Sequence, residues 1–392
     1  MEKKKKILMV HNYYQTGGGE HTVFESEVDM LKKNGHDVVT YIRSNDELKK
    51  NKLKLLFLPI VTCWSMKTYV EIRKLIKEEK IEVVHCHNTF PLISPSVYYA
   101  ARSLKVPVVQ TIHNFRLLCP AGVFNCNGNT CEECRIRENF LCALKNKCYR
   151  KSILQTAVVV TMLKLHRFMG TYRKISYIFL TEFNKEKFKG LIDISSSQVF
   201  IKPNSVERIK NEKCAKGKKR QFIFAGRLEE SKGISFVLDA WKNVPSNFRL
   251  HIYGDGPLKD IVEETVKYTD NVKYFGFQPR EIIYRDLETA QALLFASSLY
   301  EGFPMTIAES FSIGKPVVST DIGNQRDIIV ASEGGVLFSL HNEESFYKAL
   351  YEVMDNNEKY SEKAKTYYEN YLCEDYNYRK LREIYDKVKH ID

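Results

Sequence analysis

One stretch decides the fold, and it reads KILMVHNYYQTGGGEHTVFESEVDMLKK at residues 6–33. Its first six residues form a short apolar run that predicts a buried strand. A glycine triplet at 17–19 interrupts the chain, and residues 20–33 then repeat apolar side chains at helical spacing. A buried strand, a glycine loop and an amphipathic helix are the opening unit of a parallel α/β sheet.

The same alternation continues along the chain and predicts two series of strands. Helical periodicity separates most of them, for example at residues 234–242, 258–267 and 281–286. We therefore expect an α/β protein with two doubly wound, Rossmann-like domains that face each other across a cleft. The further predicted strands are 37–42, 82–87, 107–112, 176–181 and 198–202, then 222–225, 249–253, 271–275, 292–296 and 316–319.

Residues 203–219 indicate the boundary between the two series, because a Pro-Asn turn is followed there by a polar, Lys-rich link at 210–219. The predicted domains are residues 1–205, with a cysteine-rich insert at 119–148, and residues 206–374. Residues 375–392 are expected to form a helix that returns to the first domain.

Composition limits the class of protein. The 392 residues are 44% hydrophobic and 28% charged, as in soluble globular proteins. The net charge of +12 favours an anionic partner: phosphate groups, nucleic acid or the anionic face of a membrane. No apolar run is long enough for a signal peptide or a bilayer span. We expect a cytoplasmic protein, peripheral on the inner face of the cell membrane if it contacts lipid.

The segment EGFPMTIAE at residues 301–309 predicts a ligand site. A Gly-Phe-Pro turn follows the first glutamate, and Pro304 suits the first turn of a new helix. The start of a helix presents free N–H groups and partial positive charge to a phosphate, while carboxylates accept hydrogen bonds from sugar hydroxyls. The ligand-contacting residues expected here are Glu301, Gly302, Phe303, Pro304, Met305 and Glu309.

Two further motifs precede this segment and carry a resemblance together with it. They read FAGRLEESKG at residues 224–233 and IYGDGP at 252–257, and both follow predicted strands. In this order and spacing the three motifs resemble the retaining glycosyltransferases of family four, with the GT-B fold. The segments HNYY at 11–14, GGGE at 17–20, HNTFP at 87–91 and HN at 113–114 resemble the branch that builds surface polysaccharides.

The resemblance implies a role for each matching residue. Arg227 and Lys232 are expected to hold the donor's diphosphate, because fixed cations stabilise the charge of a departing nucleoside diphosphate. Glu309 is expected to accept the ribose hydroxyls, Glu301 the hydroxyls around the third and fourth carbons of the sugar, and His113 to lie near its reacting face. The predicted catalytic residues are thus Glu301, Arg227, Lys232 and His113, and the predicted donor contacts also include Gly17, Gly18, Gly19, Gly226 and Gly254.

The resemblance also implies the reaction: a sugar passes from a nucleoside diphosphate donor to a growing, lipid-linked glycan with its anomeric configuration retained. Retaining glycosidases use a carboxylate nucleophile. The resembling transferases favour front-face attack, so Glu301 is interpreted as an orienting group. No cofactor beyond the donor is expected for catalysis.

Six of the ten cysteines lie between residues 119 and 148. Cys131 and Cys134 form a chelating pair, and Cys119 and Cys148 flank them at distances that suit a structural zinc site. The alternative is a set of buried free thiols. A nucleic-acid zinc ribbon is disfavoured, because the segment lacks interleaved basic and aromatic residues.

Two basic, apolar stretches, 49–64 and 149–169, indicate contact with an anionic membrane surface, and packing on the core is the alternative. Two other functions stay open for the whole chain. One is a sugar-nucleotide epimerase or hydrolase of the same fold. The other is a non-catalytic, metal-containing binder of nucleic acid or membrane. For the glycosyltransferase itself, nucleic acid is not expected as a partner.

Overall fold

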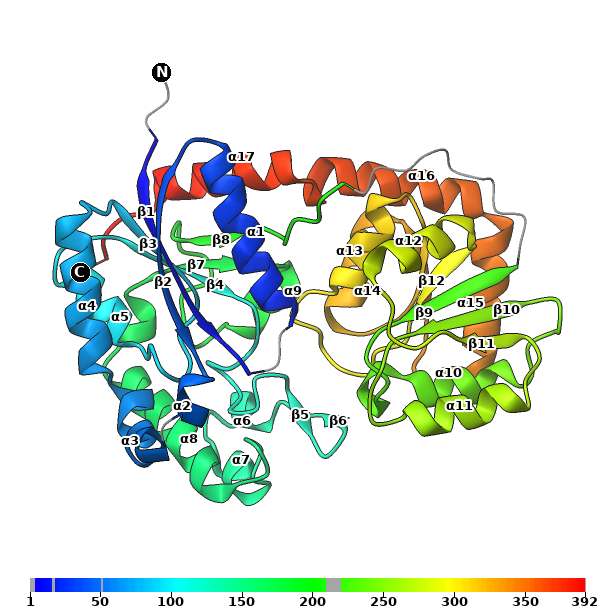
Figure 1. Ribbon diagram of the computed structural model, residues 1–392, viewed down its shortest axis with the longest axis horizontal. Coiled ribbons are helices and arrows are strands. Elements are labelled where there is room, and N and C mark those ends of the chain that lie inside the picture. The colour runs from blue at the N-terminus through cyan, green and yellow to red at the C-terminus, as the bar shows by residue number, and fades with distance from the viewer. Residues whose placement is uncertain (1–3, 16–17, 51, 209–219, 392) are drawn as a thin grey trace. The chain divides into compact units, whose positions relative to one another are not determined.

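The computed structural model describes residues 4–15, 18–50, 52–208 and 220–391, without the side chains of residues 50 and 52–54 (Figure 1). Gly17 and the Lys-rich link at 210–219 lie outside the described residues. The chain forms two compact units. The N-terminal unit comprises Met1–Cys126, Cys131–Pro203 and Tyr378–Asp392, and the C-terminal unit comprises Asn127–Thr130 and Asn204–Asn377.

A six-stranded parallel sheet forms the centre of the N-terminal unit, in the order β2-β1-β3-β4-β7-β8. The four central strands, β1, β3, β4 and β7, are buried along almost their whole length, as expected for a sheet covered by helices on both faces. The bounds of the six strands are β1 Lys6–Tyr13, β2 Asp37–Ser44, β3 Val83–Asn88, β4 Val108–Ile112, β7 Ser176–Phe179 and β8 Val199–Ile201.

Helices connect these strands, and an insert between β4 and β7 holds the cysteines. The helices are α1 Gly19–Lys33, α2 Glu47–Lys50, α3 Lys52–Cys63, α4 Met66–Glu78, α5 Ser96–Arg102 and α9 Glu182–Lys187. The insert contains the short strands β5 Asn125–Cys126 and β6 Asn129–Thr130, followed by α6 Glu133–Ile136, α7 Leu141–Lys145 and α8 Ile153–Phe168.

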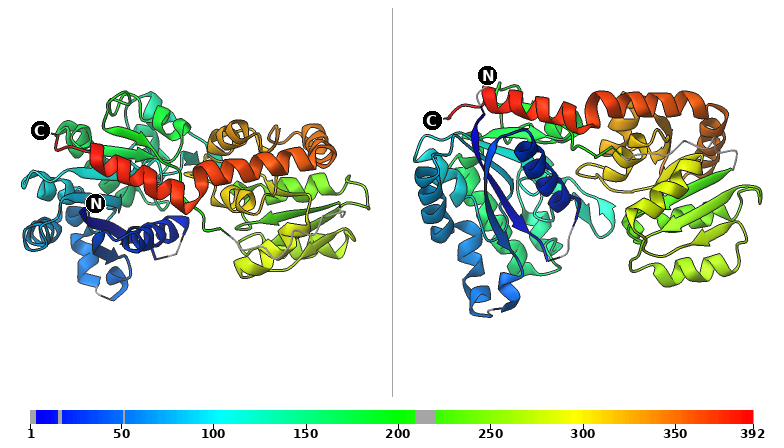
Figure 2. Two further views of the ribbon diagram at one scale, coloured as in Figure 1. Left: turned by 90° about the horizontal axis from the view of Figure 1, so that it is seen from above. Right: turned by 45° about the horizontal axis from the view of Figure 1, so that its top comes forward.

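Residues at the end of the chain complete the core of the N-terminal unit. Helix α17, Glu374–Lys387, lies beside α1 and β1 (Figures 1 and 2). Its Leu381, Ile384 and Tyr385 are buried in one cluster with Ile7 and Phe24. Burial of this apolar area fixes the helix on the unit.

The C-terminal unit has a second parallel sheet, in the order β11-β10-β9-β12-β13-β14. Its strands are β9 Gln221–Ala225, β10 Arg249–Tyr253, β11 Val272–Tyr274, β12 Ala292–Phe295, β13 Val317–Thr320 and β14 Gly335–Phe338. Its helices are α10 Ile234–Trp241, α11 Lys259–Lys267, α12 Arg280–Thr289, α13 Met305–Ser312, α14 Gly323–Ser332, α15 Glu343–Asp355 and α16 Asn357–Tyr367. The predicted α/β class with two parallel sheets is confirmed, and β14 is a strand that the sequence pattern did not predict.

Each sheet has a topological switch point, where the strand order reverses. In the N-terminal sheet it lies between β1 and β3, and in the C-terminal sheet between β9 and β12. Doubly wound sheets bind ligands outside the carboxyl ends of the strands at this point. The loops after β1, β3, β9 and β12 are therefore the first places to look for a site.

Within the described residues, no single helix has both the length and the apolar character needed to cross a bilayer. One bent pair, Leu55–Cys63 with Met66–Glu78, meets the combined requirement of length and composition, with 56° between its halves.

Candidate functional site

In the C-terminal unit, an ion pair joins the two loops at the switch point. Lys232 follows β9 and Glu301 follows β12, and Lys232 Nζ lies 2.6 Å from Glu301 Oε1. Ser297 donates a hydrogen bond of 2.7 Å to the same carboxylate oxygen. The Lys232 and Glu301 side chains remain 32% and 20% exposed, so an anion can reach the ammonium. The structure thus brings together two of the predicted residues.

Two glycines let these loops approach closely. Gly233 has φ of +73°, and a Cβ there would lie 2.0 Å from the carbonyl oxygen of Ala296. Gly254 has φ of +135°, and a Cβ there would lie 1.8 Å from the carbonyl oxygen of Gly226. Side chains at either position would push apart the loops that end β9, β10 and β12.

The Gly-Phe-Pro turn holds Glu301 in place from the backbone side. Asn324 of α14 donates to the carbonyl oxygens of Glu301 and Gly302, the latter at 3.1 Å. Phe303 and Pro304 are buried, and Met305 opens α13. Pro304 stands at the N-cap position with φ of −78°, one residue before the first helical turn that the sequence predicted for it.

Glu309 lies inside α13, nearly buried. Its carboxylate is 3.6 Å from Arg280 Nη1, and it also interacts with the Tyr284 hydroxyl. Burial raises the pKa of Glu309, while Arg280 and the hydrogen bond with Tyr284 oppose the rise. The carboxylate is therefore held by α12 and has no contact with Lys232 among those the structure gives.

Arg227 forms an ion pair with Glu229 and not with Glu301. Its guanidinium lies 3.0 Å from Glu229, and its side chain is 59% exposed. Arg227 shares the loop after β9 with Lys232 but reaches toward solvent.

In the N-terminal unit, the corresponding loops bring histidines together. His11 lies near the end of β1, His87 near the end of β3, and His113 follows β4. His87 Nδ1 and His113 Nε2 lie 2.9 Å apart, and the His11 and His87 ring centroids lie 6.4 Å apart. Gly18 is the N-cap of α1 and Gly19 its first residue, so the described part of the glycine loop leads from β1 into this helix.

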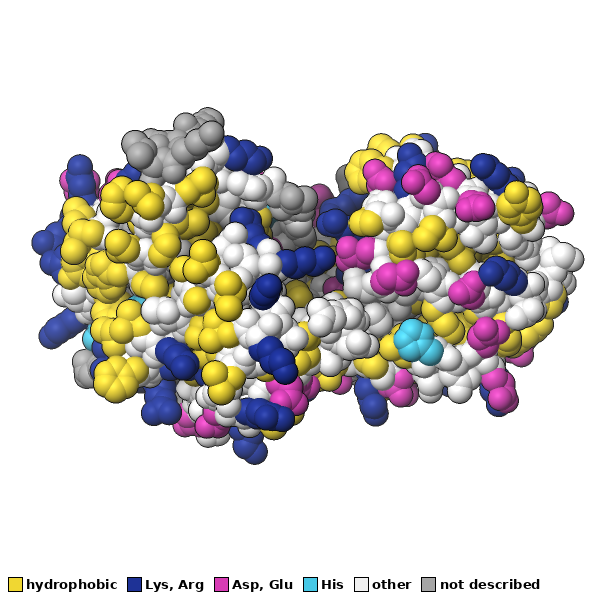
Figure 3. All heavy atoms as spheres, turned by 90° about the horizontal axis from the view of Figure 1, so that it is seen from below, with side chains coloured by type: hydrophobic (Ala, Val, Ile, Leu, Met, Phe, Trp, Pro, Cys, Tyr) yellow, Lys and Arg dark blue, Asp and Glu magenta, His cyan; other side chains and the backbone are white. Residues whose placement is uncertain are grey.

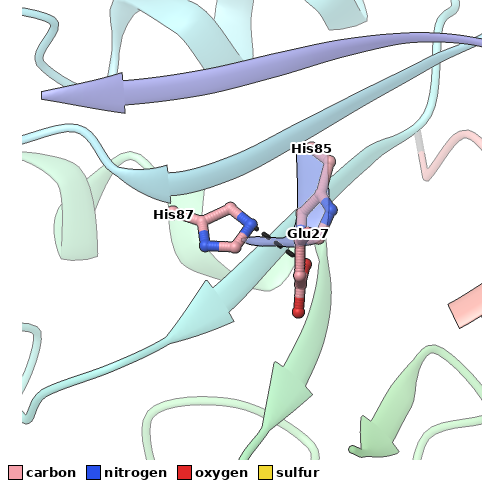
Figure 4. Close-up of side chains that lie close together, drawn as sticks. All are labelled: Glu27, His85 and His87. Carbon is pink, nitrogen blue, oxygen red and sulfur yellow. Dashed lines mark ion pairs between the residues drawn. The ribbon is translucent and has the colours of Figure 1, made fainter. Parts of the chain in front are cut away.

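A buried chain of polar groups supports His113 from behind. Lys202 Nζ lies 2.5 Å from Glu27 Oε1, and Glu27 Oε2 lies 3.3 Å from His87 Nε2 (Figure 4). If Glu27 is ionised, the proton of His87 belongs on Nε2, so His87 Nδ1 accepts from His113 Nε2. The chain Lys202–Glu27–His87–His113 then leaves Nδ1 of His113 as a hydrogen-bond acceptor.

The pKa shifts of Glu27 and His113 agree with this sequence of hydrogen-bond donors and acceptors. Burial would raise the pKa of Glu27, but Lys202 and His87 outweigh it and hold the pKa well below 4.5. Burial and the neighbouring His87 lower the pKa of His113 well below its ordinary value, so the imidazole is neutral at neutral pH. His113 therefore acts as a neutral hydrogen-bonding group.

Glu27, His85 and His87 also form a group whose potential metal-ligand atoms all lie within 4.8 Å of one another (Figure 4). The ammonium of Lys202 already neutralises Glu27, and His85 lies 2.7 Å from both Tyr385 Oη and Thr111 Oγ1. Glu27 Oε1 and both ring nitrogens of His85 therefore have partners, while Glu27 Oε2 and His87 Nε2 lie 3.3 Å from each other and have no hydrogen-bond partner among the described residues.

Glu27 and Lys202 were not predicted from the sequence. The available signal was the spacing of α1: Phe24, Glu27, Val28 and Leu31 fall on one face, so a charged residue occupies an apolar stripe. A buried carboxylate requires a partner. The sequence could not show that this partner comes from the end of β8.

Glu20, which follows the glycine loop, is an unusual carboxyl group. Burial raises the pKa of Glu20 to about 8, although Arg116 and a hydrogen bond from Asn114 oppose the rise. Asn114 Nδ2 lies 3.5 Å from its Oε2. Glu20 is thus mostly protonated at neutral pH.

Glu20→Gln should change how stability depends on pH. Between the ordinary pKa of 4.5 and about 8, the folded protein keeps a proton that the unfolded chain has lost. Stability contributed by Glu20 therefore falls as pH rises through this window. At about 1.4 kcal/mol per pKa unit, the glutamine variant should gain a few kcal/mol relative to wild type between about pH 5 and about pH 8.

Urea unfolding at a series of pH values measures this difference. Asp29→Asn, at an exposed position of the same helix, is the matched control and should leave the pH profile unchanged. A Glu20→Gln profile parallel to wild type would contradict the raised pKa.

The cysteines of the insert are neighbours. Burial, together with smaller contributions from nearby thiols including Cys119, raises the pKa of Cys134 and Cys148 to about 12. Among the described residues, the cysteine sulfurs form no group of three within 4.8 Å of one another. Zinc binding by Cys119, Cys131, Cys134 and Cys148 stays a prediction.

Comparisons with known proteins agree with this architecture. The family described as glycosyltransferase family 4 matches residues 17–129, and glycosyl transferases group 1 matches residues 205–370. The first match covers the glycine loop and both histidines of the His87–His113 pair. The second covers Lys232, Glu301 and Glu309.

Similar proteins carry related names. A lipopolysaccharide 1,6-galactosyltransferase of Escherichia coli K12 is 34% identical over 130 residues, 31% of this chain and 36% of that protein. The match therefore spans only about a third of that relative's length. The UDP-Gal:alpha-D-GlcNAc-diphosphoundecaprenol alpha-1,3-galactosyltransferase of Escherichia coli is 24% identical over 84% of this chain and 80% of its own length.

Among solved structures, the apo form of the lipopolysaccharide outer core galactosyltransferase WaaB has a TM-score of 0.66 at 17% identity. The match covers 97% of this chain and 98% of that one, which shows a shared fold. With two parallel-sheet units and both family matches in place, the chain belongs to the glycosyltransferases of the family 4 type, with the GT-B fold.

Proposed function

We propose that this protein transfers a hexose from a nucleoside diphosphate sugar to a growing, lipid-linked glycan, with retention at the anomeric carbon. The observation that carries the donor half is the Lys232–Glu301 pair at the switch point of the C-terminal sheet. A partly exposed cation beside a carboxylate offers one group for a diphosphate and one for sugar hydroxyls. The UDP-linked donor in the name of the Escherichia coli relative supports uracil as the base.

In this proposal, different residues of the C-terminal unit bind the diphosphate, the sugar and the ribose of the donor. Lys232 binds the diphosphate, and Arg227 turns from Glu229 toward the same charge. Glu301, released from Lys232, accepts hydroxyls of the transferred sugar. Glu309 accepts the ribose hydroxyls from its place between Arg280 and Tyr284. Residues 206–374 thus form the donor domain.

Residues 1–205 would hold the acceptor, braced by the helix of 375–392. His113, neutral and oriented through His87 and Glu27, presents Nδ1 to a hydroxyl of the bound sugar. Diphosphoundecaprenol in a relative's name supports a lipid-linked acceptor. Exclusion of water from the bound donor would protect it from hydrolysis.

The chemical step proposed is front-face transfer. The acceptor hydroxyl attacks the anomeric carbon on the face that the diphosphate leaves, and a leaving phosphate oxygen takes the hydroxyl proton. Lys232 stabilises the charge on that phosphate, so the site needs no carboxylate nucleophile.

Thermal-shift measurement with UDP, GDP and ADP tests the donor half. A ligand that binds only the folded state stabilises it by about 2.7 kcal/mol at one hundred times its Kd. We expect UDP to raise the melting temperature most, and to do so less in Lys232→Met. A chain that no nucleoside diphosphate stabilises, or that binds single-stranded nucleic acid tightly instead, would contradict the proposal.

A further inference from the structure

A large cavity in the N-terminal unit takes no part in the histidine site. It measures about 420 Å³, which is within the usual size of ligand pockets. Its walls are mostly apolar side chains: Leu55, Leu58 and Pro59 along α3, Leu154, Val158 and Val159 from the first half of α8, and Phe90 and Pro91 from the loop after β3. Cys63 O accepts from His166 Nε2 at 2.9 Å, which ties the C-terminal ends of the two helices together. The cavity lies between these two helices and reaches Thr62, next to Cys63.

The mouth of the cavity is basic and polar. Lys49, Arg150 and Gln15 line the cavity and are exposed, and Asn45, which follows β2, lines it from a buried position. Lys49 forms a surface ion pair with Asp46 at 3.1 Å, and the Arg150 guanidinium lies over the Tyr149 ring. An apolar pocket with two accessible cations at its entrance suits a ligand with a hydrocarbon tail and an anionic head.

The mouth is connected to the histidine site. Gln15 Nε2 donates to Asn45 O at 3.2 Å, and Asn12 Nδ2 donates to Asn45 Oδ1 at 3.0 Å. Asn12 follows His11 in β1. A ligand whose head lies at Lys49 and Arg150 would therefore extend its next group along Asn45 toward the histidines.

The surface around the cavity is apolar as well. Helix α3 exposes Leu55, Leu56, Phe57 and Ile60 at 49%, 73%, 57% and 65%, and α8 exposes Leu154 at 76%. Figure 3 shows hydrophobic side chains gathered on this face of the N-terminal unit, with Lys and Arg side chains among them. Such a continuous apolar area is unusual on a protein that meets only water, and it suits the interface of an anionic bilayer.

We propose that the α3–α8 cavity binds the isoprenoid tail of a polyprenyl diphosphate-linked acceptor, with its diphosphate between Lys49 and Arg150. The tail leaves the bilayer on which the exposed α3 and α8 side chains rest and enters between the helices. The saccharide then lies along Asn45 toward His113. This inference rests on the proposed function for the identity of the acceptor, and on the cavity alone for the class of ligand.

Geranylgeranyl diphosphate is the probe, used below its micelle concentration, with inorganic pyrophosphate and geranylgeraniol as partial probes. We expect the whole molecule to bind at least tenfold more tightly than either part. Val158→Phe fills the cavity from α8 and should weaken binding about tenfold or more. Arg150→Glu should do the same through the head group.

Thr161→Phe is the matched control. Threonine has nearly the volume of valine, so this change adds the same bulk one turn further along α8, at an exposed position that does not line the cavity. It should bind the probe as wild type does. Stabilisation by UDP should be unchanged in all three variants, which keeps this test separate from the test of the proposed function.

Two outcomes would overturn the inference: no binding of the probe by a wild-type protein that UDP stabilises, or equal binding by Val158→Phe and Thr161→Phe. If the probe binds as expected but no nucleoside diphosphate does, the cavity assignment stands and the proposed function fails.

Discussion

Replacing Lys232 by methionine should lower the rate of sugar transfer by ~10²–10³, the usual cost of removing one group that stabilises developing charge. Methionine keeps the length of the side chain and removes the ammonium that lies 2.6 Å from Glu301. The diphosphate would then leave without its nearest cation. The measurement is kcat and KM for the donor, because loss of a transition-state contact lowers kcat as well as kcat/KM.

Lys242→Met is the matched control. Lys242 also forms an ion pair, 2.7 Å from Asp239, but it follows the end of α10, away from the loops at the switch point. It should retain full activity. Equal loss in the two variants would mean a general effect of charge, and full activity of Lys232→Met would remove this residue from the reaction.

Replacing Lys202 by methionine should destabilise the N-terminal unit by ~3–5 kcal/mol, because the buried carboxylate of Glu27 loses its counter-charge. Both side chains are almost completely buried, and their atoms lie 2.5 Å apart. Urea unfolding followed by circular dichroism measures the change. Lys185→Met, which breaks the surface pair with Glu182, is the control and should cost less than about 1 kcal/mol.

The pH dependence gives a second check on the same pair. The low pKa of Glu27 contributes stability above about pH 4.5, and this stability is lost as pH falls toward the folded-state value. In Lys202→Met, burial should raise the pKa of Glu27 instead. The difference between the two proteins should therefore shrink as the solution is acidified below about pH 4.5, and a constant difference would contradict the ion-pair explanation.

The double variant Glu27→Leu with Lys202→Met separates the loss of stability from the loss of transfer activity. Removing both charges leaves no unpaired group, so much of the lost stability should return. The His87–His113 pair would then lack its carboxylate. Transfer should stay low even where folding recovers, because the tautomer of His113 is no longer fixed.

Local sequence was enough to predict most strands. The run at residues 249–253 and the helix at 234–242 agree with β10 and α10 to within a residue. Their periodicity reflects burial on one or both faces, which is a local property. Strand β14 was missed because Gly335–Phe338 is only four residues long and half of it is only partly buried.

The sequence predicted those site residues that come directly after a strand. Lys232 and Glu301 each follow a predicted strand, and parallel strands place such loops at one edge. The backing of His113 was not predictable, because Glu27, His87 and Lys202 come from α1, β3 and the end of β8. No local pattern encodes a partner 175 positions away.

The sequence by itself determined the alternation of strands and helices, the glycine-rich loops and the family, since each depends on residues close together in the chain. Tertiary structure decided which strand ends are neighbours, and with that which charges meet. Buried ion pairs and the α3–α8 cavity depend on packing between distant elements, and the energy of a charge depends on what surrounds it in space.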